Sequence, residues 1–395
     1  MALLGASWWQ RLSAIPCLPL LAWEALRGRT ARRQKVNWGD SQLQLWLPDD
    51  AGPLGFFAVL NLLAGTMAWV GPSLSLRDEP ARPDSRWPAF LPGVFSLSDL
   101  RQRTGIAFSD RAEIEDQYAA ERGPKKDLAL ALRSLLVSWL PPAPPVCPER
   151  LRLFGLSLAN PTMAQALDQL QQWTQSPQPQ LVAFLNAHCV NVSYRNSDYR
   201  EALRHSDWLL ADGFGLRLAG LLLQQPIRDN VNGTDLFPPL CERLQADTTR
   251  VFLFGAKPGV AEAVADWMAV HAPGLEVVGC QHGFLEAGQE ELLLQRLQQC
   301  RPQLTLVALG VPAQELWLQR NREKLPPGLY LAVGGLFDFY SGQTPRAPQW
   351  LREIGLEWGY RLWQEPGRMW KRYLVGNFVF ALHAWKEYRK RGNNR

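Results

Sequence analysis

The chain has 395 residues, of which 47% are hydrophobic and 20% charged, and its formal net charge at pH 7 is +5. This length allows two or three domains, and the hydrophobic fraction is sufficient for a large core. The mild charge excess does not indicate a nucleic-acid partner. The six scattered cysteines lack the C-x-x-C spacing of a zinc site, so we expect free thiols in a reducing compartment.

Two apolar stretches lie near the N-terminus. Arg11 interrupts the first one and no clear small-residue cleavage site follows it, so we predict no signal peptide. The second, residues 51–76, carries no charge and is long enough for a membrane span of about 20 residues. Glycine, proline and asparagine interrupt it repeatedly, which favours folded or membrane-surface structure over a span.

The clearest break in the chain is Pro141-Pro142-Ala143-Pro144-Pro145. Proline clusters cannot continue a helix or a sheet and behave as stiff spacers. We therefore predict a proline-rich linker over residues 141–148, which separates a smaller mixed α+β domain at residues 1–140 from the rest of the chain.

After the linker, apolar runs of strand length alternate with amphipathic helical patterns. The runs cover 181–185, 208–211, 251–254, 275–278, 304–309 and 330–333; helical patterns cover 188–195, 216–223, 259–271 and 314–325 and begin near 234 and 289. Mostly apolar strands between helices are typical of a parallel sheet with helices on both faces. We predict a Rossmann-like α/β domain over residues 149–345, with ligands at the carboxyl ends of the strands.

Residues suited to binding or catalysis follow the predicted strands. They are, in chain order, Asn186, Asp212, Gly255, Phe284, Gly310, Gln314, Glu315 and Asp338. A glycine after a strand is usually only a turn and an aspartate there often caps a helix, but convergence of polar residues after successive strands indicates a ligand site. We expect His188 and His282, near the same edge, to pack or hydrogen-bond rather than to catalyse.

Residues 346–395 form a basic, tryptophan-rich C-terminal appendage. From Arg361 onward nine basic and two acidic residues give a net charge of +7, which exceeds that of the whole chain. Aromatic residues are interleaved with these charges. The combination is typical of contact with an anionic membrane surface, although a helix that covers a core gives a similar pattern.

Several segments resemble, together and in order, the WecG/TagA/CpsF glycosyltransferases (glycosyltransferase family 26). The resemblance runs from about residue 151 to 373. The segments that carry it include Ala211-Asp212-Gly213-Phe214-Gly215, Asn232-Gly233-Thr234-Asp235-Leu236, Leu309-Gly310-Val311-Pro312, Gln314-Glu315, Val333-Gly334-Gly335, Phe337-Asp338 and Arg346-Ala347-Pro348. Asn230 stands where the family usually has a basic residue.

The resemblance implies an inverting transfer of a sugar from a UDP-sugar to a polyprenyl-diphosphate-linked acceptor, in the synthesis of a cell-surface polysaccharide. The enzyme would work without a cofactor, in the cytoplasm on the inner face of the plasma membrane. Asp212 would be the general base that takes the proton of the acceptor hydroxyl, and Asn186 would orient the substrate. The remaining strand-end residues would lie around the nucleotide and the sugar: Gly255, Phe284, Gly310, Gln314, Glu315 and Asp338.

The appendage would close over this site and supply Arg361, Arg368 and Lys371 to neutralise the diphosphate leaving group. Lys371 stands where an arginine can occur, so an ammonium group replaces a guanidinium group that could donate two hydrogen bonds to one phosphate. The chain has no D-x-D spacing of the kind that holds a divalent ion on a diphosphate. Fixed cations must then carry the developing charge, and we predict a reaction that needs no metal.

The N-terminal segment resembles in part the polyprenyl-phosphate sugar-1-phosphate transferases. Residues 61–72 and 92–97, followed by Tyr118 and Asp127-Leu128, carry this resemblance. The acidic pair that those enzymes need upstream is missing, so residues 1–140 are interpreted as a degenerate, inactive relative. A basic cluster after the apolar residues 15–26 fits docking on a membrane or a partner: Arg27, Arg29, Arg32, Arg33 and Lys35.

Two alternatives have different chemistry. The first is a non-catalytic, membrane-associated assembly subunit of a polysaccharide synthesis complex, in which Asp212 would have no catalytic role. The second is a dinucleotide-dependent oxidoreductase, which the absence of a strand-linked G-x-G-x-x-G disfavours. The sequence leaves open which sugar is transferred and whether the chain forms a homo-oligomer.

Overall fold

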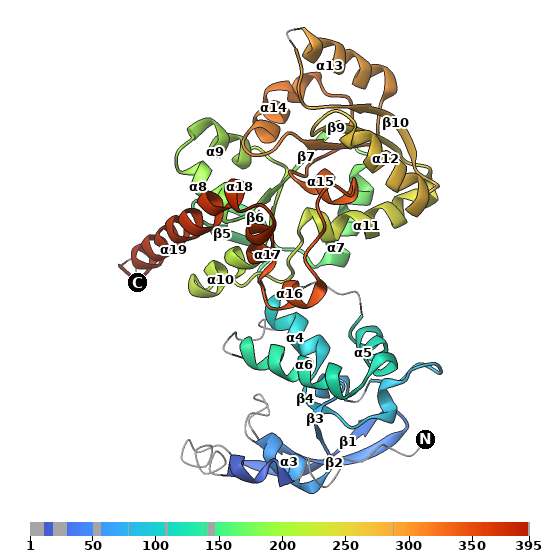
Figure 1. Cartoon of the computed structure of the whole chain (residues 1–395), viewed down its shortest axis with the longest axis vertical. Coiled ribbons are helices and arrows are strands. Elements are labelled where there is room, and N and C mark those ends of the chain that lie inside the picture. The colour runs from blue at the N-terminus through green and yellow to red at the C-terminus, as the bar shows by residue number, and fades with distance from the viewer. Residues whose placement is uncertain are drawn as a thin grey trace. The chain divides into compact units, whose positions relative to one another are not determined.

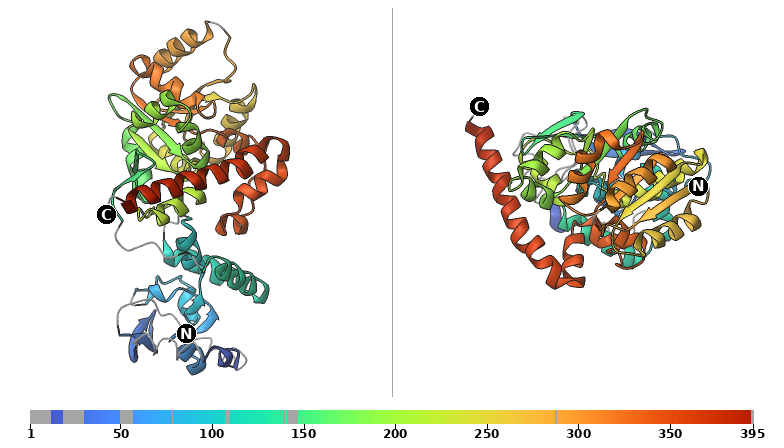
Figure 2. Two further views of the ribbon diagram at one scale, coloured as in Figure 1. Left: turned by 90° about the vertical axis from the view of Figure 1, so that its left-hand side faces the viewer. Right: turned by 90° about the horizontal axis from the view of Figure 1, so that it is seen from above.

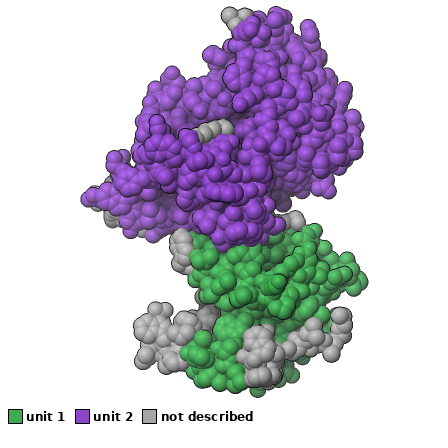
Figure 3. All heavy atoms as spheres, viewed as in Figure 1, with its two compact units in different colours: residues 1–142 green, residues 143–395 purple. Residues whose placement is uncertain are grey.

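The computed structural model describes residues 12–18, 30–49, 57–77, 79–106, 110–138, 140, 147–286 and 288–393, with the side chains of 368, 392 and 393 left out. The chain divides into two compact units, Met1–Pro142 and Ala143–Arg395 (Figure 3). The apolar stretch that Arg11 interrupts, Arg27 and Arg29, and most of the predicted proline linker lie largely or wholly outside the described residues.

The first unit mixes short strands and helices, as expected (Figure 1). An antiparallel hairpin pairs β1 (Ala31–Trp38) with β2 (Ser41–Pro48), and a parallel pair joins β3 (Ala68–Val70) to β4 (Gly93–Phe95). The α-helices among its described residues are α3 (Ala58–Ala64), α4 (Leu97–Thr104), α5 (Arg111–Glu121) and α6 (Pro124–Leu136).

Residues 57–76 fold as part of this unit. Asn61 is completely buried in α3, where its side-chain Oδ1 accepts from the Trp46 backbone N–H at 2.7 Å and its Nδ2 donates to the Trp46 carbonyl at 2.9 Å. This pair of bonds satisfies the backbone N–H and carbonyl of Trp46 in β2 and fixes the helix on the hairpin. Across the described ranges, no helix is long and apolar enough to cross a membrane.

The second unit is built on an eight-stranded sheet in the order β10-β9-β11-β12-β7-β8-β6-β5. All neighbouring strands are parallel except the edge pair β5–β6. The strands are β5 (Arg150–Leu153), β6 (Leu156–Ala159), β7 (Pro179–Leu185), β8 (Trp208–Ala211), β9 (Arg250–Gly255), β10 (Glu276–Gln281), β11 (Leu304–Ala308) and β12 (Gly328–Ala332).

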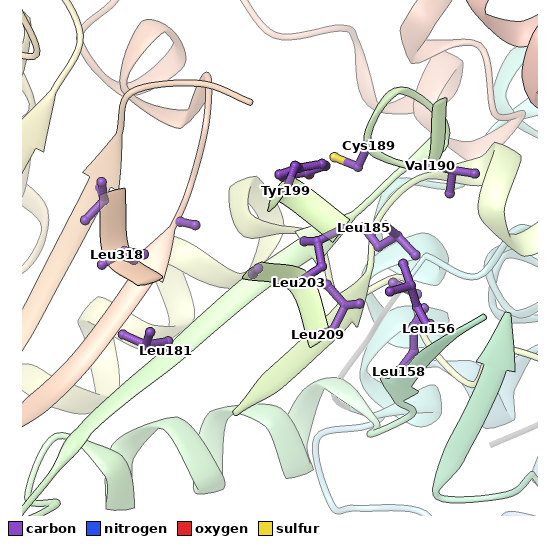
Figure 4. Close-up of a cluster of buried hydrophobic side chains, with 14 of the residues drawn as sticks. Leu156, Leu158, Leu181, Leu185, Cys189, Val190, Tyr199, Leu203, Leu209 and Leu318 are labelled. Carbon is purple, nitrogen blue, oxygen red and sulfur yellow. The ribbon is translucent and has the colours of Figure 1, made fainter. Parts of the chain in front are cut away.

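Alternate side chains of each central strand enter two separate cores, one on each face of the sheet. In β7, Leu181, Ala183 and Leu185 belong to one core, and Val182 and Phe184 belong to the other. Figure 4 shows part of the first core around β7. This two-sided burial explains why the strands are apolar throughout and confirms the prediction of a parallel sheet with helices on both faces.

The helices divide between the two faces accordingly. The first face carries α8 (Ala187–Ser193), α9 (Ser197–Arg204), α10 (Phe214–Leu222), α13 (Gln289–Cys300) and α14 (Ala313–Asn321). The second carries α7 (Met163–Trp173), α11 (Gly233–Leu244), α12 (Val260–His271) and α15 (Leu336–Tyr340).

The structure differs from the sequence prediction at β10, which continues to Gln281 instead of ending at 278. Gly279, the first residue after the predicted run, lies inside the strand beside a register irregularity. A Cβ at this position would come within 2.5 Å of the Phe252 ring on β9. Glycine is therefore required here by close packing between strands and not by a turn.

The C-terminal residues form a helical appendage that lies on the second unit (Figure 2). It consists of α16 (Gln349–Glu353), α17 (Glu357–Gln364), α18 (Pro366–Trp370), a π-helical segment η7 (Lys371–Val375) and α19 (Gly376–Asn393). Phe380 and Ala384 of α19 are buried in the first core. The Asn191 side chain donates to the Gly376 carbonyl at 2.7 Å, and Tyr194 stacks on His383 at 3.9 Å, so α8 anchors α19.

Candidate active site

Asn186 and Asp212, the two predicted catalytic residues, are hydrogen-bonded to each other. Asn186 follows β7 and Asp212 follows β8, and these neighbouring strands pair in parallel with Leu185 opposite Ala211. The Asn186 Oδ1 caps α8 by accepting from the His188 and Cys189 backbone N–H groups at 3.1 Å each. Its Nδ2 donates to Asp212 Oδ2 at 3.1 Å, so one amide holds both the helix and the carboxylate.

The surroundings of Asp212 favour its protonated form more than water would. Burial is the largest cause and raises the pKa of its carboxyl, while the Asn186 hydrogen bond opposes this shift. Nearby Glu357 and Asp235 raise the pKa further, and Arg372 lowers it. A carboxylate with a raised pKa is a stronger base than an ordinary aspartate, as removal of a hydroxyl proton requires.

The loop after β8 is fixed by Asn230. The Gly213 backbone N–H donates to Asn230 Oδ1 at 2.7 Å. Gly213 has a φ of +90°, and a Cβ there would meet no described heavy atom within 4 Å, so the backbone beside Asp212 borders open space. A basic side chain at 230, as the family resemblance would suggest, could not accept this hydrogen bond.

A group of charged residues joins α11 to the appendage and was not among the predicted site residues. Asp235 Oδ1 binds Arg346 at 2.7 Å and Arg352 at 3.0 Å, and Arg346 lies 3.5 Å from Glu357. Asn232 caps α11 and donates to Asp235 Oδ2 at 2.6 Å. The signal for this group was available, because Asp235 and Arg346 both lie in the segments that carried the resemblance.

Gln314 is buried, and its side-chain amide is fully used within the protein. Its Oε1 accepts from the backbone N–H groups of Gly310 at 3.2 Å and Gly334 at 3.0 Å. Its Nε2 donates to Glu315 Oε1 at 2.9 Å and to the Ala332 carbonyl at 3.1 Å. Both amide hydrogens and both lone pairs of the oxygen are thereby occupied. Gln314 thus ties together the loops after β11 and β12.

Glu315 is only 3% exposed and lies behind these loops. Burial raises the pKa of its carboxyl to about 7, and the hydrogen bond from Gln314 opposes the shift. Its Oε2 has no hydrogen-bond partner in the described part of the chain. Cys189 of α8 and Tyr199 of α9 are its electrostatic neighbours. Glu315 therefore lies between Gln314, which joins the two loops, and α8, which Asn186 caps.

The other predicted substrate-binding residues occupy different environments. A Cβ on Gly255 would come within 2.5 Å of the Ala308 carbonyl, so this glycine permits close approach of β9 and β11. Gly310 borders open space in the way Gly213 does. Phe284 follows β10 and is 64% exposed. Asp338 Oδ2 lies 3.6 Å from the position that a Cβ on Gly335 would take.

The predicted cations also differ in position. Arg361 Nη2 lies 3.6 Å from the same point beside Gly335, and its guanidinium stacks on Phe339 at 4.8 Å. Lys371 is exposed and lies over Trp370 at 5.5 Å. The backbone of Arg368 lies in α18, and its side chain is outside the described atoms.

Arg372, which was not predicted, is half-buried. Its buried Nε has no hydrogen-bond partner among the atoms described. Its charge lowers the pKa of Asp212, and it reinforces the effect of burial in lowering the pKa of His188 to about 4. His188 is therefore neutral at physiological pH. Within the described residues, no three His, Cys, Asp or Glu side chains gather as a metal site would require.

A half-buried carboxylate at the carboxyl edge of a parallel sheet, with cations from a C-terminal appendage nearby, is suited to a group-transfer enzyme with an anionic leaving group. Comparison with known proteins identifies this class. Residues 151–394 match the family model described as "Glycosyl transferase WecG/TagA/CpsF family", so the chain belongs to this family and is a glycosyltransferase.

Curated relatives with similar sequences come from two bacilli. The chain is 30% identical over 207 residues to the "N-acetylglucosaminyldiphosphoundecaprenol N-acetyl-beta-D-mannosaminyltransferase" of Bacillus subtilis (strain 168), covering 52% of this chain and 79% of the relative. It is 32% identical over 189 residues to the protein of the same name from Bacillus spizizenii, covering 48% and 72%. The family match begins at residue 151 and does not bear on the N-terminal resemblance.

Proposed function

We propose that this enzyme transfers a hexose, N-acetylhexosamine or its uronate from a UDP-sugar to a polyprenyl-diphosphate-linked sugar in cell-surface polysaccharide synthesis. The observation that carries the proposal is the Asn186–Asp212 pair at the carboxyl edge of the sheet. The names of the two curated relatives specify a diphosphoundecaprenol-linked N-acetylglucosamine and the transfer of an N-acetylmannosaminyl group, and this supports a lipid-linked acceptor.

In this mechanism Asp212 takes the proton of the acceptor hydroxyl through the carboxylate oxygen that Asn186 does not hold. The acceptor oxygen attacks the anomeric carbon, and the bond between that carbon and the UDP oxygen breaks with its electron pair on UDP. A single displacement inverts the configuration at the anomeric carbon. Arg361 and Arg372 are suited to stabilise the charge that develops on the diphosphate, together with the predicted Arg368.

The same proposal needs no metal ion, because guanidinium groups would carry the charge that a divalent cation carries in other nucleotide-sugar transferases. Full activity in excess chelator is the expected result. Strict dependence on Mg²⁺ or Mn²⁺ would overturn this part of the proposal and leave the role of Asp212 in place.

We also place the enzyme peripherally on the inner face of the plasma membrane. The appendage exposes a row of large apolar side chains between basic ones. Arg389 stacks on Trp385 at 4.9 Å, an arrangement suited to the boundary between water and anionic headgroups. The exposed apolar residues of the appendage include Trp363, Trp370, Leu374, Phe378, Trp385 and Tyr388.

For the N-terminal unit we propose a structural role. The residues that resemble sugar-1-phosphate transferases make internal contacts: Asn61 binds β2, and the Tyr118 hydroxyl donates to Asp127 at 2.5 Å. Arg122 binds both Asp127 at 3.1 Å and the Val70 carbonyl at 2.8 Å. Sugar-1-phosphate transfer that survives Asp212→Asn and is lost on substitution within residues 1–140 would refute the inactive interpretation.

The test of the main proposal measures UDP release from a panel of UDP-sugars, with a short-chain polyprenyl-diphosphate-sugar as acceptor. Acceptor-dependent release should fall by about 10² or more in Asp212→Asn, because the amide cannot take the proton. Release that is unchanged in the variant would refute the base assignment. If no donor in the panel supports release, the proposal fails in favour of a non-catalytic assembly subunit.

A further inference from the structure

One carboxylate, that of Asp235 on α11, holds the first part of the C-terminal appendage. Its Oδ1 binds Arg346 at 2.7 Å and Arg352 at 3.0 Å, and its Oδ2 accepts from the Asn232 side chain at 2.6 Å. The side chains of the aspartate and both arginines are only 22–29% exposed. Ion pairs on an open surface contribute little, but a half-buried carboxylate that holds two guanidinium groups fixes their geometry.

Asp235 is also connected to the loop that carries the proposed base. Asn232 caps α11 by accepting from the Asp235 backbone N–H at 2.8 Å. The Asn232 backbone N–H donates to the Asn230 carbonyl at 2.9 Å, and Asn230 Oδ1 accepts from the Gly213 N–H at 2.7 Å. A series of hydrogen bonds therefore leads from the backbone beside Asp212 to the two arginines of the appendage.

A packing contact joins the same loop to the appendage. Gly355 lies between α16 and α17 and has a φ of +75°. A Cβ at this position would come within 2.6 Å of the Phe214 ring. The ring therefore lies directly against the appendage backbone, two residues after Asp212. Residues 346–357 are thus held at two points, by the ion pairs of Asp235 and by this contact.

The segment held in this way leads directly into α17, which carries Arg361. Glu357 is the first residue of α17, and its carboxylate lies 3.5 Å from Arg346. Arg361 follows about one turn later, and its Nη2 lies 3.6 Å from the position that a Cβ on Gly335 would take, in the loop after β12. The place of this guanidinium at the carboxyl edge of the sheet therefore depends on how residues 346–357 are held.

We propose that Asp235 is a positioning residue of the transfer reaction, which acts through Arg346 and Arg352 to set where Arg361 lies relative to the donor diphosphate. The proposal rests on the proposed function, in which Arg361 stabilises the leaving group. Asp235 itself needs no contact with the substrate. Because a displacement of about 1 Å lowers the rate of such a step about a hundredfold, a residue remote from the reacting atoms has a large effect on catalysis.

Asp235→Asn in the full chain is the test, because it keeps the size of the side chain and removes the charge that holds the two arginines. We expect kcat/KM for the UDP-sugar to fall about tenfold or more and inhibition by UDP to weaken by a similar factor, with the KM of the acceptor unchanged. A smaller folded fraction would lower only the apparent kcat, so these quantities separate positioning from a loss of folded protein.

Asp168→Asn is the matched control. It also removes an aspartate that pairs with an arginine of α11, but this arginine, Arg243, lies in the last turn of the helix and its partner lies on α7. The control should keep wild-type rates and UDP inhibition. Arg346→Gln breaks the ion pairs of Asp235 from the appendage side and should reproduce the losses of Asp235→Asn, which keeps the proposal testable if that variant does not fold.

A double-mutant cycle with Arg361→Gln tests whether Asp235 acts through Arg361. In the Arg361→Gln background, Asp235→Asn should lower kcat/KM by no more than about twofold. An equal loss in both backgrounds would overturn the proposal, as would wild-type kcat/KM and UDP inhibition in Asp235→Asn.

Calorimetric binding of UDP distinguishes a failure of this proposal from a failure of the proposed function, because it requires neither acceptor nor transfer. If the wild type bound UDP but transferred no sugar from any donor, the proposed function would fail. Weaker UDP binding by Asp235→Asn would then still support the placement of Arg361 by Asp235, and equal binding would overturn it. A wild type that binds no UDP would overturn both.

Discussion

Replacing Gln314 with leucine tests whether this residue positions the site or contacts the sugar. The substitution keeps a buried side chain of similar size and removes all four hydrogen bonds of the amide. The backbone N–H groups of Gly310 and Gly334 then lose their acceptor. Both loops border open space at the carboxyl edge of the sheet, so a displacement there changes the shape of the candidate site.

The magnitude follows from these contacts. An unpaired buried polar group costs roughly 1–3 kcal/mol, and the two N–H groups lie where water can reach them, so the lower part of that range applies to each. We expect unfolding free energy to fall by about 2–4 kcal/mol. A displacement of about 1 Å in a site of this kind lowers the rate about a hundredfold, so kcat/KM should fall by that factor.

The assay combines urea unfolding with initial rates and with inhibition by the product UDP. Gln319→Leu is the matched control, since it changes the same residue type on the same helix, and the Gln319 Oε1 is buried without a partner among the described residues. The control should keep wild-type rates. Gln314→Glu retains an acceptor for Gly310 and Gly334 and should recover part of the activity.

A positioning role predicts that Gln314→Leu weakens binding of UDP itself as well as the reaction of every UDP-sugar. If UDP inhibition and stability stayed at the wild-type level while only the preference among donor sugars changed, Gln314 would be a sugar contact. That result would refute the reasoning from its saturated amide.

Three further predictions concern the base and its surroundings. Asn186→Ala should lower kcat about tenfold to a hundredfold. It should also move the acid limb of the pH profile to higher pH, because the Asn186 hydrogen bond lowers the pKa of Asp212 in the wild type and its loss raises that pKa. Arg372→Gln should move the same limb to higher pH and lower kcat/KM about a hundredfold. The control Lys371→Gln, at an exposed position, should leave both nearly unchanged. Equal losses of kcat/KM in the two variants would refute the role given to Arg372. Because the pKa of Glu315 is raised to about 7 in the folded protein, the wild-type unfolding free energy should fall by about 3 kcal/mol as pH rises from about 4.5 to 7. Glu315→Gln should remove this pH dependence, and urea unfolding at pH 5 and pH 8 measures the difference.

Much of the central sheet was predictable because its strands are buried on both faces. The apolar runs of β7, β9 and β11 are long enough to stand out from the amphipathic helices between them. The hairpin of β5 and β6 was missed, since each strand has four residues and Arg150 and Arg152 point outward in β5. Such short alternating segments resemble loops when read alone.

The pairing of Asn186 with Asp212 followed from topology, because adjacent parallel strands end side by side. The choice between Lys371 and Arg372 could not follow from the sequence. These two residues lie in a π-helical segment, where each turn holds about one residue more than an α-helix. The resemblance pointed to Lys371, and a periodicity of 3.6 does not give the orientation of side chains in such a segment. In the structure Lys371 is exposed, whereas Arg372 is half-buried and its charge lowers the pKa of Asp212.

The appendage has a second effect besides supplying cations. Glu357 in α17 raises the pKa of Asp212 and Arg372 in η7 lowers it, and both come from residues 346–395. Glu357 is held beside the site by Arg346, which also binds Asp235 on α11. The proton affinity of the base is therefore set in part by the segment whose arginines are suited to the leaving group. Base strength and charge stabilisation at the diphosphate consequently depend on the same docked segment, which ties proton removal to the presence of the cations that the displacement needs.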